Sequence, residues 1–134
     1  MNVLVIDGQG GKLGREIVEK IKSNFADAEV TAVGTNTLAT VAMQKGGADN
    51  IATGENAVVV CAKTADVIVG PIGVAIANSL FGEITPKMAE AVGSSSATKI
   101  LIPLNKCKTL IAGVGNVSVS TMLDDVIATI AKIK

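Results

Sequence analysis

Residues 3–14 read Val3-Leu4-Val5-Ile6-Asp7-Gly8-Gln9-Gly10-Gly11-Lys12-Leu13-Gly14, and this stretch decides the fold. A short apolar run is followed by four glycines, and a helical pattern of apolar residues begins at once. That order predicts a buried strand, a tight turn and a helix. Free backbone N–H groups and the helix dipole make such a helix N-terminus favourable for an anion. The stretch therefore predicts a phosphate-binding α/β domain, without indicating a reaction.

The composition predicts an aliphatic core and argues against one class of partner. Hydrophobic residues make up 49% of the chain, but there are only two Phe, no Tyr and no Trp. Aliphatic side chains must fill the core, which suits parallel strands covered on both faces. The formal net charge is zero, from 12 basic and 12 acidic residues. Because there is no basic stripe and only two aromatic side chains could stack on bases, we expect no nucleic-acid partner.

The length of 134 residues predicts a single domain, residues 1–134. The N-terminal apolar run lacks the features of a signal peptide, and the longest apolar stretch, residues 67–81, is too short and interrupted for a membrane span. Cys61 and Cys107 stand apart, as is typical of free thiols in a reducing compartment. We therefore expect a cytoplasmic protein with no membrane partner.

Strand-like and helix-like segments alternate along the chain. We expect strands at residues 3–6, 29–33, 50–52, 67–69, 99–104 and 110–114, and helices at 12–23, 36–45, 73–80 and 85–93, with a short one ending at 62 and a last one starting near 118–120. Such alternation predicts a parallel sheet with right-handed crossovers. The expected fold is a three-layer, Rossmann-like, doubly wound α/β fold with a mainly parallel sheet of five to six strands.

Ligands of such sheets bind beyond the carboxyl ends of the strands. The loops that follow the expected strands supply the candidate ligand-binding residues, which are Asp7, Gly8, Gln9, Gly10, Gly11, Thr35, Asn36, Thr53, Glu55, Asn56, Gly70, Pro71 and Asn105.

The glycines of the first loop resemble a dinucleotide-binding fingerprint. They form G-x-x-G-x-x-G through Gly8, Gly11 and Gly14, or use Gly10 as the residue of close approach. In such fingerprints the glycines make the turn, admit the pyrophosphate and let the helix meet the strand. A Walker A loop is excluded, because Leu13 follows Lys12 where that motif needs Ser or Thr. The alternative is a purely structural turn.

The tip of the second expected strand, Gly34-Thr35-Asn36, carries no charge. Sites for NAD usually place an acidic residue there, and sites for NADP an Arg nearby. Thr35 or Asn36 could still hydrogen-bond a ribose or a phosphate, and the alternative is that Asn36 or Thr37 only caps the next helix. The neutral tip predicts little discrimination between NAD and NADP.

The remaining chemistry is sparse: the sequence identifies no catalytic residue, which leaves open whether the protein is an enzyme, and we predict no metal site. Asp7 is either a ligand to a metal or ribose or a cap of the turn, and Glu55 is either a base or ribose ligand or an ordinary acid of a first helical turn. The chain has no His, which excludes Ser-His-Asp and Cys-His machinery and leaves Cys107 without a base.

The chain resembles an uncharacterised family of short bacterial Rossmann-like proteins, classed as a domain of unknown function. The resemblance rests on Ile6-Asp7-Gly8-Gln9-Gly10-Gly11, Gly34-Thr35-Asn36, Thr53-Gly54-Glu55-Asn56, Asp66-Val67-Ile68-Val69-Gly70-Pro71-Ile72-Gly73 and Ile102-Pro103-Leu104-Asn105. It implies a Rossmann-like fold and no particular activity.

Two functions remain open. The first is binding of a nucleotide, a dinucleotide or another phosphorylated small molecule at the glycine-rich turn. The alternative is a non-catalytic regulatory or scaffold subunit whose glycine turn is structural. Residues 73–81 are apolar nearly all round, which predicts a helix buried on every side and hence a homodimer. The alternative is that neighbouring loops of the same chain cover this helix. A carboxylate introduced at Gly11 is expected to abolish anion binding and leave the fold largely intact.

Overall fold

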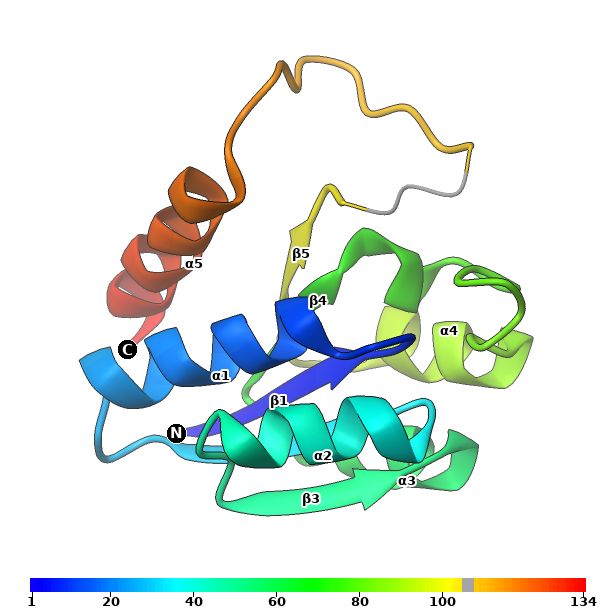
Figure 1. Cartoon of the computed structure of the whole chain (residues 1–134), viewed down its shortest axis with the longest axis horizontal. Coiled ribbons are helices and arrows are strands. Elements are labelled where there is room, and N and C mark those ends of the chain that lie inside the picture. The colour runs from blue at the N-terminus through cyan, green and yellow to red at the C-terminus, as the bar shows by residue number, and fades with distance from the viewer. Residues whose placement is uncertain (105–107) are drawn as a thin grey trace.

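The computed structural model describes residues 1–104 and 108–134 (Figure 1). Its elements follow the order β1 (Asn2–Asp7), α1 (Lys12–Asn24), β2 (Glu29–Gly34), α2 (Thr37–Lys45), β3 (Asn50–Thr53), α3 (Glu55–Ala62), β4 (Val67–Pro71), the 3₁₀ turn η1 (Ile72–Ala75), α4 (Pro86–Ser94), β5 (Thr98–Ile102) and α5 (Val119–Ile133). The predictions for Asn105 and Cys107 lie outside the described residues.

Five parallel strands form one sheet in the order β3-β2-β1-β4-β5. Val3 pairs with Val30 on one side and with Val67 on the other, so β1 is central. The strand order reverses between β1 and β4, and ligands of doubly wound sheets bind at such a switch point. The Rossmann-like, parallel α/β fold expected from the sequence is confirmed.

Helices cover both faces of the sheet, and β1 shows why. Its successive side chains point to opposite faces, so Val3 and Val5 enter one apolar cluster while Leu4 and Ile6 enter the other. The first cluster also contains the apolar faces of α1 and α5 and one residue of α2, and the second contains those of α3 and α4. Figure 1 shows α1, α2 and α5 on the near side of the sheet.

Three helix starts agree with the capping residues in the sequence. Asn36 caps α2 through a 2.9 Å hydrogen bond from the Ala39 amide, and Thr85 and Ser118 cap α4 and α5 in the same way. No helix in residues 1–104 and 108–134 is both long and apolar enough to cross a bilayer.

The expected sixth strand, residues 110–114, is wrong. In the described part of this region the chain forms turns and irregular structure, and the sheet ends at β5. Gly113 has φ 83°, a left-handed conformation that interrupts a regular strand, and Leu110 is 89% exposed. The run is apolar, but its backbone makes a turn at residues 112–113 and forms no ladder with the described strands.

The expected helix at residues 73–80 is also wrong. After η1 the chain continues as a series of turns, in which Asn78, Leu80, Phe81 and Gly82 have positive φ values between 56° and 86°. Leu80 is buried within the chain's own second cluster, whereas Phe81 is 99% exposed. The prediction of a homodimer therefore loses the buried helix on which it rested. We call residues 76–85 the strap.

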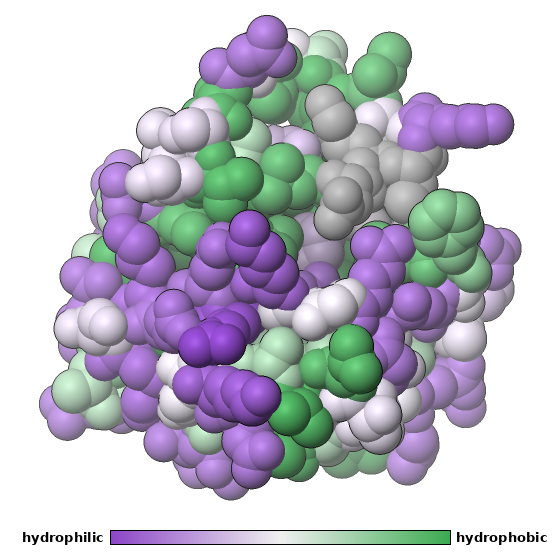
Figure 2. Space-filling model, viewed as in Figure 1, coloured by the Kyte–Doolittle hydropathy of each residue, from purple (hydrophilic) through white to green (hydrophobic). Residues whose placement is uncertain are grey.

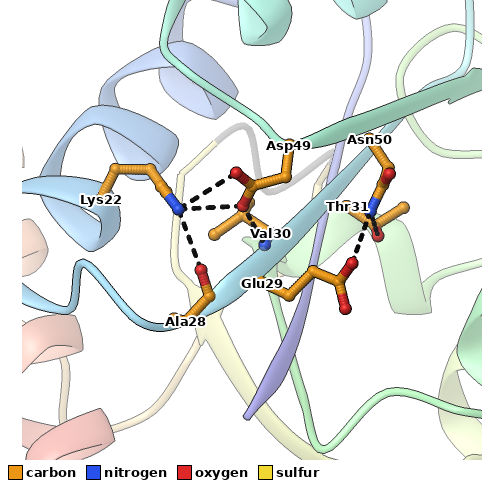
Figure 3. A network of polar contacts seen from close by, with 7 residues as sticks. All are labelled: Lys22, Ala28, Glu29, Val30, Thr31, Asp49 and Asn50. Atoms are coloured by element: carbon orange, nitrogen blue, oxygen red, sulfur yellow. Dashed lines mark hydrogen bonds and ion pairs between the residues drawn. The ribbon is translucent and has the colours of Figure 1, made fainter.

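A polar network fastens the amino-terminal end of β2 to β3 (Figure 3). Asp49 accepts a 2.8 Å hydrogen bond from the buried Val30 amide and forms an ion pair of 2.9 Å with Lys22. Lys22 also donates to the Ala28 carbonyl at 3.0 Å. The hydrogen bond from Val30 and then that from Lys22 hold the pKa of Asp49 below its ordinary value.

Replacing Asp49 with Ala is expected to lower the free energy of unfolding by about 1–3 kcal/mol, because the Val30 amide is left buried without an acceptor. Since the folded pKa of Asp49 is lowered, the ionic part of its contribution is present above the unfolded pKa of about 3.9 and is lost as the pH falls through the folded value. Urea unfolding should show that the difference in free energy of unfolding between wild type and Asp49→Ala is smaller at pH 3 than at pH 7. The control is Asp27→Ala, at an exposed carboxylate, and an equal loss in both variants would contradict the account.

Candidate functional site

The glycine turn joins β1 to α1 in a conformation that depends on Gly11. The Gly11 amide donates to the Gly8 carbonyl at 3.0 Å, and Gln9 and Gly11 have φ values of 50° and 75°. A Cβ atom on Gly11 would lie 2.6 Å from the Cα of Ala39 in α2. Only glycine combines this φ with so close an approach to a neighbouring backbone.

Gly10 differs, because it faces open space. It is exposed, and no heavy atom lies within 4 Å of the position of an added Cβ. The amides of Gly10, Lys12 and Leu13 donate no hydrogen bond to any residue that the structure describes. These three N–H groups form the positive end of α1 and are available to an acceptor from outside.

A pocket of about 400 Å³ opens beside Gly10, between α1 and α2. Two cations line it, Arg15 from α1 and Lys45 from the last turn of α2. Arg15 is already paired with Glu19 at 2.9 Å, on an exposed part of α1. No sequence pattern predicted Lys45 at this place, because it lies at the end of α2 and does not follow the carboxyl end of a strand.

Asp7 proves to be a cap of the turn. Its side chain is buried, and its two oxygens accept hydrogen bonds from the amides of Gly8 at 2.8 Å and Gly14 at 2.7 Å. Burial raises the pKa of Asp7, these two hydrogen bonds oppose the rise, and the charge of Glu83 adds to it. Of the two readings of Asp7 in the sequence, the structure therefore supports the capping one.

Glu83, in the strap, lies over the glycine turn, and the sequence did not single it out. Its Oε1 atom accepts three hydrogen bonds, from the Gln9 amide at 2.8 Å, the Thr35 hydroxyl at 2.5 Å and the Asn36 amide group at 3.0 Å. Partial burial raises the pKa of Glu83, but the three hydrogen bonds together lower it by more, so the net shift of the pKa is downward. The carboxylate is thus held ionised at the tips of β1 and β2.

Gly8 allows the Glu83 carboxylate to lie this close to the glycine turn. A Cβ atom there would lie 2.6 Å from the Thr35 hydroxyl oxygen and 2.7 Å from Oε1 of Glu83. Asn36 completes the cluster, since its side-chain amide also donates to the Gln9 carbonyl at 3.0 Å. Asn36 is therefore both the cap of α2 and part of the site.

The structure places the other candidate residues away from Glu83 or inside the core. Thr53 hydrogen-bonds to Thr40 at 2.7 Å on the far side of β2, and Glu55 and Asn56 follow it in α3. Among the described residues, none of these three forms a hydrogen bond or ion pair with Glu83. Gly70 and Pro71 are buried, and Gly70 packs against the Ile6 carbonyl. Within the described ranges, no group of acidic or Cys side chains is arranged to hold a metal ion. The site is therefore concentrated on residues 8–13, 35–36 and 83.

A larger pocket, of about 510 Å³, lies elsewhere, between β5, residues 111–117 and α5. Ile100, Ile102, Val114 and Met122 are among its apolar lining residues, and Asp125 is its charged one. Figure 2 shows the apolar surface that surrounds it, beside α5. This pocket is bigger, but the described residues that line it include no cation and their charged group is a carboxylate, so we favour the glycine turn as the place for an anion.

Three comparisons with known proteins bear on this chain. The model of the family described as "Domain of unknown function (DUF3842)" matches residues 2–134. Among curated proteins, none matches the sequence. The chain is similar to the solved structure of a dodecameric FMN-dependent UbiX-like decarboxylase from Escherichia coli O157:H7. The two share 12% sequence identity with a TM-score of 0.45, and the match covers 98% of this chain and 93% of that chain. A similarity of that size carries no argument about ligand or assembly.

Proposed function

This chain belongs to the family described as a domain of unknown function, DUF3842. We propose its function from the residues of the candidate site. The protein binds a nucleotide or another phosphorylated small molecule at the glycine turn. The observation that carries the proposal is the set of unpartnered amides of Gly10, Lys12 and Leu13, which lies beside the pocket that Arg15 and Lys45 line.

The chemistry of these groups suits a phosphate. Backbone N–H groups at a helix N-terminus hydrogen-bond phosphate oxygens, and the helix dipole adds favourable charge. Cations on the pocket wall add to this attraction, Arg15 as a planar donor and Lys45 as a point charge. The carboxylates of Asp7 and Glu83 disfavour a phosphate directly over Gln9, so the Gly10 side of the turn is the proposed phosphate position.

The alternative function is a regulatory or scaffold subunit in which the turn only connects β1 to α1. Gly11 gives this alternative some support, because its φ and its contact with α2 require glycine for structural reasons alone. Self-association likewise stays a prediction. Since the expected helix is absent at residues 73–80, the exposed Phe81 is the residue to examine for a role in a dimer interface.

A ligand screen distinguishes binding from a structural turn. A ligand at a hundred times its dissociation constant is expected to stabilise the fold by about 2.7 kcal/mol. For a domain of this size that corresponds to a rise in melting temperature of roughly 8–15 °C. The panel contains pyrophosphate, adenine and guanine nucleotides, NAD, NADP, FMN and sugar phosphates, each with and without magnesium.

The result expected is a rise for pyrophosphate and a larger one for at least one nucleotide. Folded protein, free of co-purified ligand, that shows no shift with any of these compounds would favour the scaffold alternative.

A further inference from the structure

An acid is missing from the tip of β2 in the sequence, but the fold brings one there. Thr35 and Asn36 follow β2 and are neutral, whereas dinucleotide sites usually have an acidic residue near this position to accept the ribose hydroxyls. Glu83 reaches the same tip from the strap, on the other side of the switch point, and binds both Thr35 and Asn36. Its carboxylate thus lies next to the glycine turn, although it is far from β2 along the chain.

The hydrogen bonds of Glu83 leave part of its carboxylate available. All three described bonds end on Oε1, and no group in residues 1–104 and 108–134 donates to Oε2. No Lys or Arg in the described ranges forms an ion pair with Glu83. The Thr35, Asn36 and Gln9 donors fix the orientation of the carboxylate. Its second oxygen, Oε2, therefore has a defined position but no hydrogen-bond donor among the described residues.

The charge at this place selects the kind of ligand group. Glu83 is ionised, its charge acts on Asp7, and no cation in the described part of the chain neutralises it. A phosphate brought to Oε2 would be repelled, whereas a hydroxyl would donate a charge-assisted hydrogen bond. A vicinal pair of hydroxyls, as in ribose, is the nucleotide group that suits it.

We propose that Glu83 is the ribose-binding acid of the site, so that the ligand is a ribonucleotide with a free 2′-hydroxyl. The phosphate lies on the amides of Gly10, Lys12 and Leu13, and the ribose lies toward Glu83. This inference rests on the proposed function and adds the ligand class to it. It also replaces the expectation of little discrimination between NAD and NADP, because the carboxylate repels a 2′-phosphate and NAD is preferred.

The test compares ligands that differ only in the ribose. Isothermal titration calorimetry of the full chain measures pyrophosphate, ADP and GDP, and the 2′,3′-dideoxy forms of both nucleotides. In wild type, at least one ribonucleotide is expected to bind about 10- to 100-fold more tightly than its dideoxy form, because a hydrogen bond to a charged group is lost. In Glu83→Gln the ratio is expected to fall below about threefold, with pyrophosphate affinity within about threefold of wild type.

Glu90→Gln, at an exposed position of α4, removes the same charge outside this cluster and should keep the wild-type ratio. The wild-type comparison needs no variant, so a poorly folded Glu83→Gln protein does not prevent the test. Equal affinity of ribonucleotide and dideoxynucleotide in wild type would overturn the role of Glu83 while leaving phosphate binding intact. A gain of more than about tenfold in pyrophosphate affinity in Glu83→Gln would also overturn it, because Glu83 would then be an occupant of the phosphate position. Failure of pyrophosphate and all nucleotides to bind removes the proposed function and this inference together.

Discussion

Replacing Gly10 with Asp is expected to weaken binding of pyrophosphate and of nucleoside diphosphates by at least about a hundredfold. The new carboxylate would stand among the free amides at the start of α1, where it takes their hydrogen bonds and repels the phosphate. The fold should remain, because no heavy atom lies within 4 Å of an added Cβ and Gly10 is not in the left-handed region. Calorimetric titration measures the loss, and thermal unfolding confirms that the variant is folded.

The matched control is Gly115→Asp. Gly115 also has open space at the Cβ position and no left-handed backbone, and it lies in the segment before α5. The substitution adds the same charge to the chain, so it should leave the affinity for pyrophosphate unchanged. A folded Gly10→Asp protein with wild-type affinity would show that the phosphate does not lie on this turn.

Replacing Gly11 with Ala is expected to lower the free energy of unfolding by about 2–5 kcal/mol. The left-handed φ of 75° costs a non-glycine residue roughly 1–2 kcal/mol, and the contact of 2.6 Å with the Ala39 backbone adds roughly 1–3 kcal/mol of overpacking. Gly113→Ala is the control, because Gly113 has a similar φ of 83° but no atom near its Cβ. Urea unfolding should therefore show a loss of only about 1–2 kcal/mol in the control.

Equal losses in the two variants would mean that α2 gives way easily and that the turn is not held by this contact. The expected loss also corrects a sequence-based expectation. An Asp at Gly11 would disturb the packing of the turn on α2, so it cannot test anion binding in an intact fold, and Gly10 is the position that can.

The parts of the fold that depend on neighbours in the sequence were predictable. The β1–turn–α1 unit follows from one apolar run and its glycines, and the caps Asn36, Thr85 and Ser118 act within three residues of themselves. The segments 73–80 and 110–114 were mispredicted for the opposite reason. Both are apolar enough for a helix or a strand, but the left-handed residues Leu80 and Gly113 mark backbone turns that an apolar pattern does not reveal.

The site was predictable only in part. Gly8, Gln9, Gly10, Thr35 and Asn36 follow strand ends, and the parallel sheet brings these ends to one edge. Glu83 was missed because its contacts join positions 74 and 48 residues apart, to Gln9 and to Thr35. No periodicity or motif reports a contact of that kind, and the tip of β2 therefore had no visible acid.

Nuclear magnetic resonance of the ¹⁵N-labelled full chain tests the central claim most directly. Pyrophosphate is titrated into the protein, and the backbone amide resonances are followed one by one. Phosphate binding at the turn predicts that the largest shifts are those of Gly10, Lys12 and Leu13, because their N–H groups gain an anionic acceptor. Saturating shifts confined to other residues, such as Val114 and Met122 of the apolar pocket, or the absence of any shift at these three amides, would contradict it.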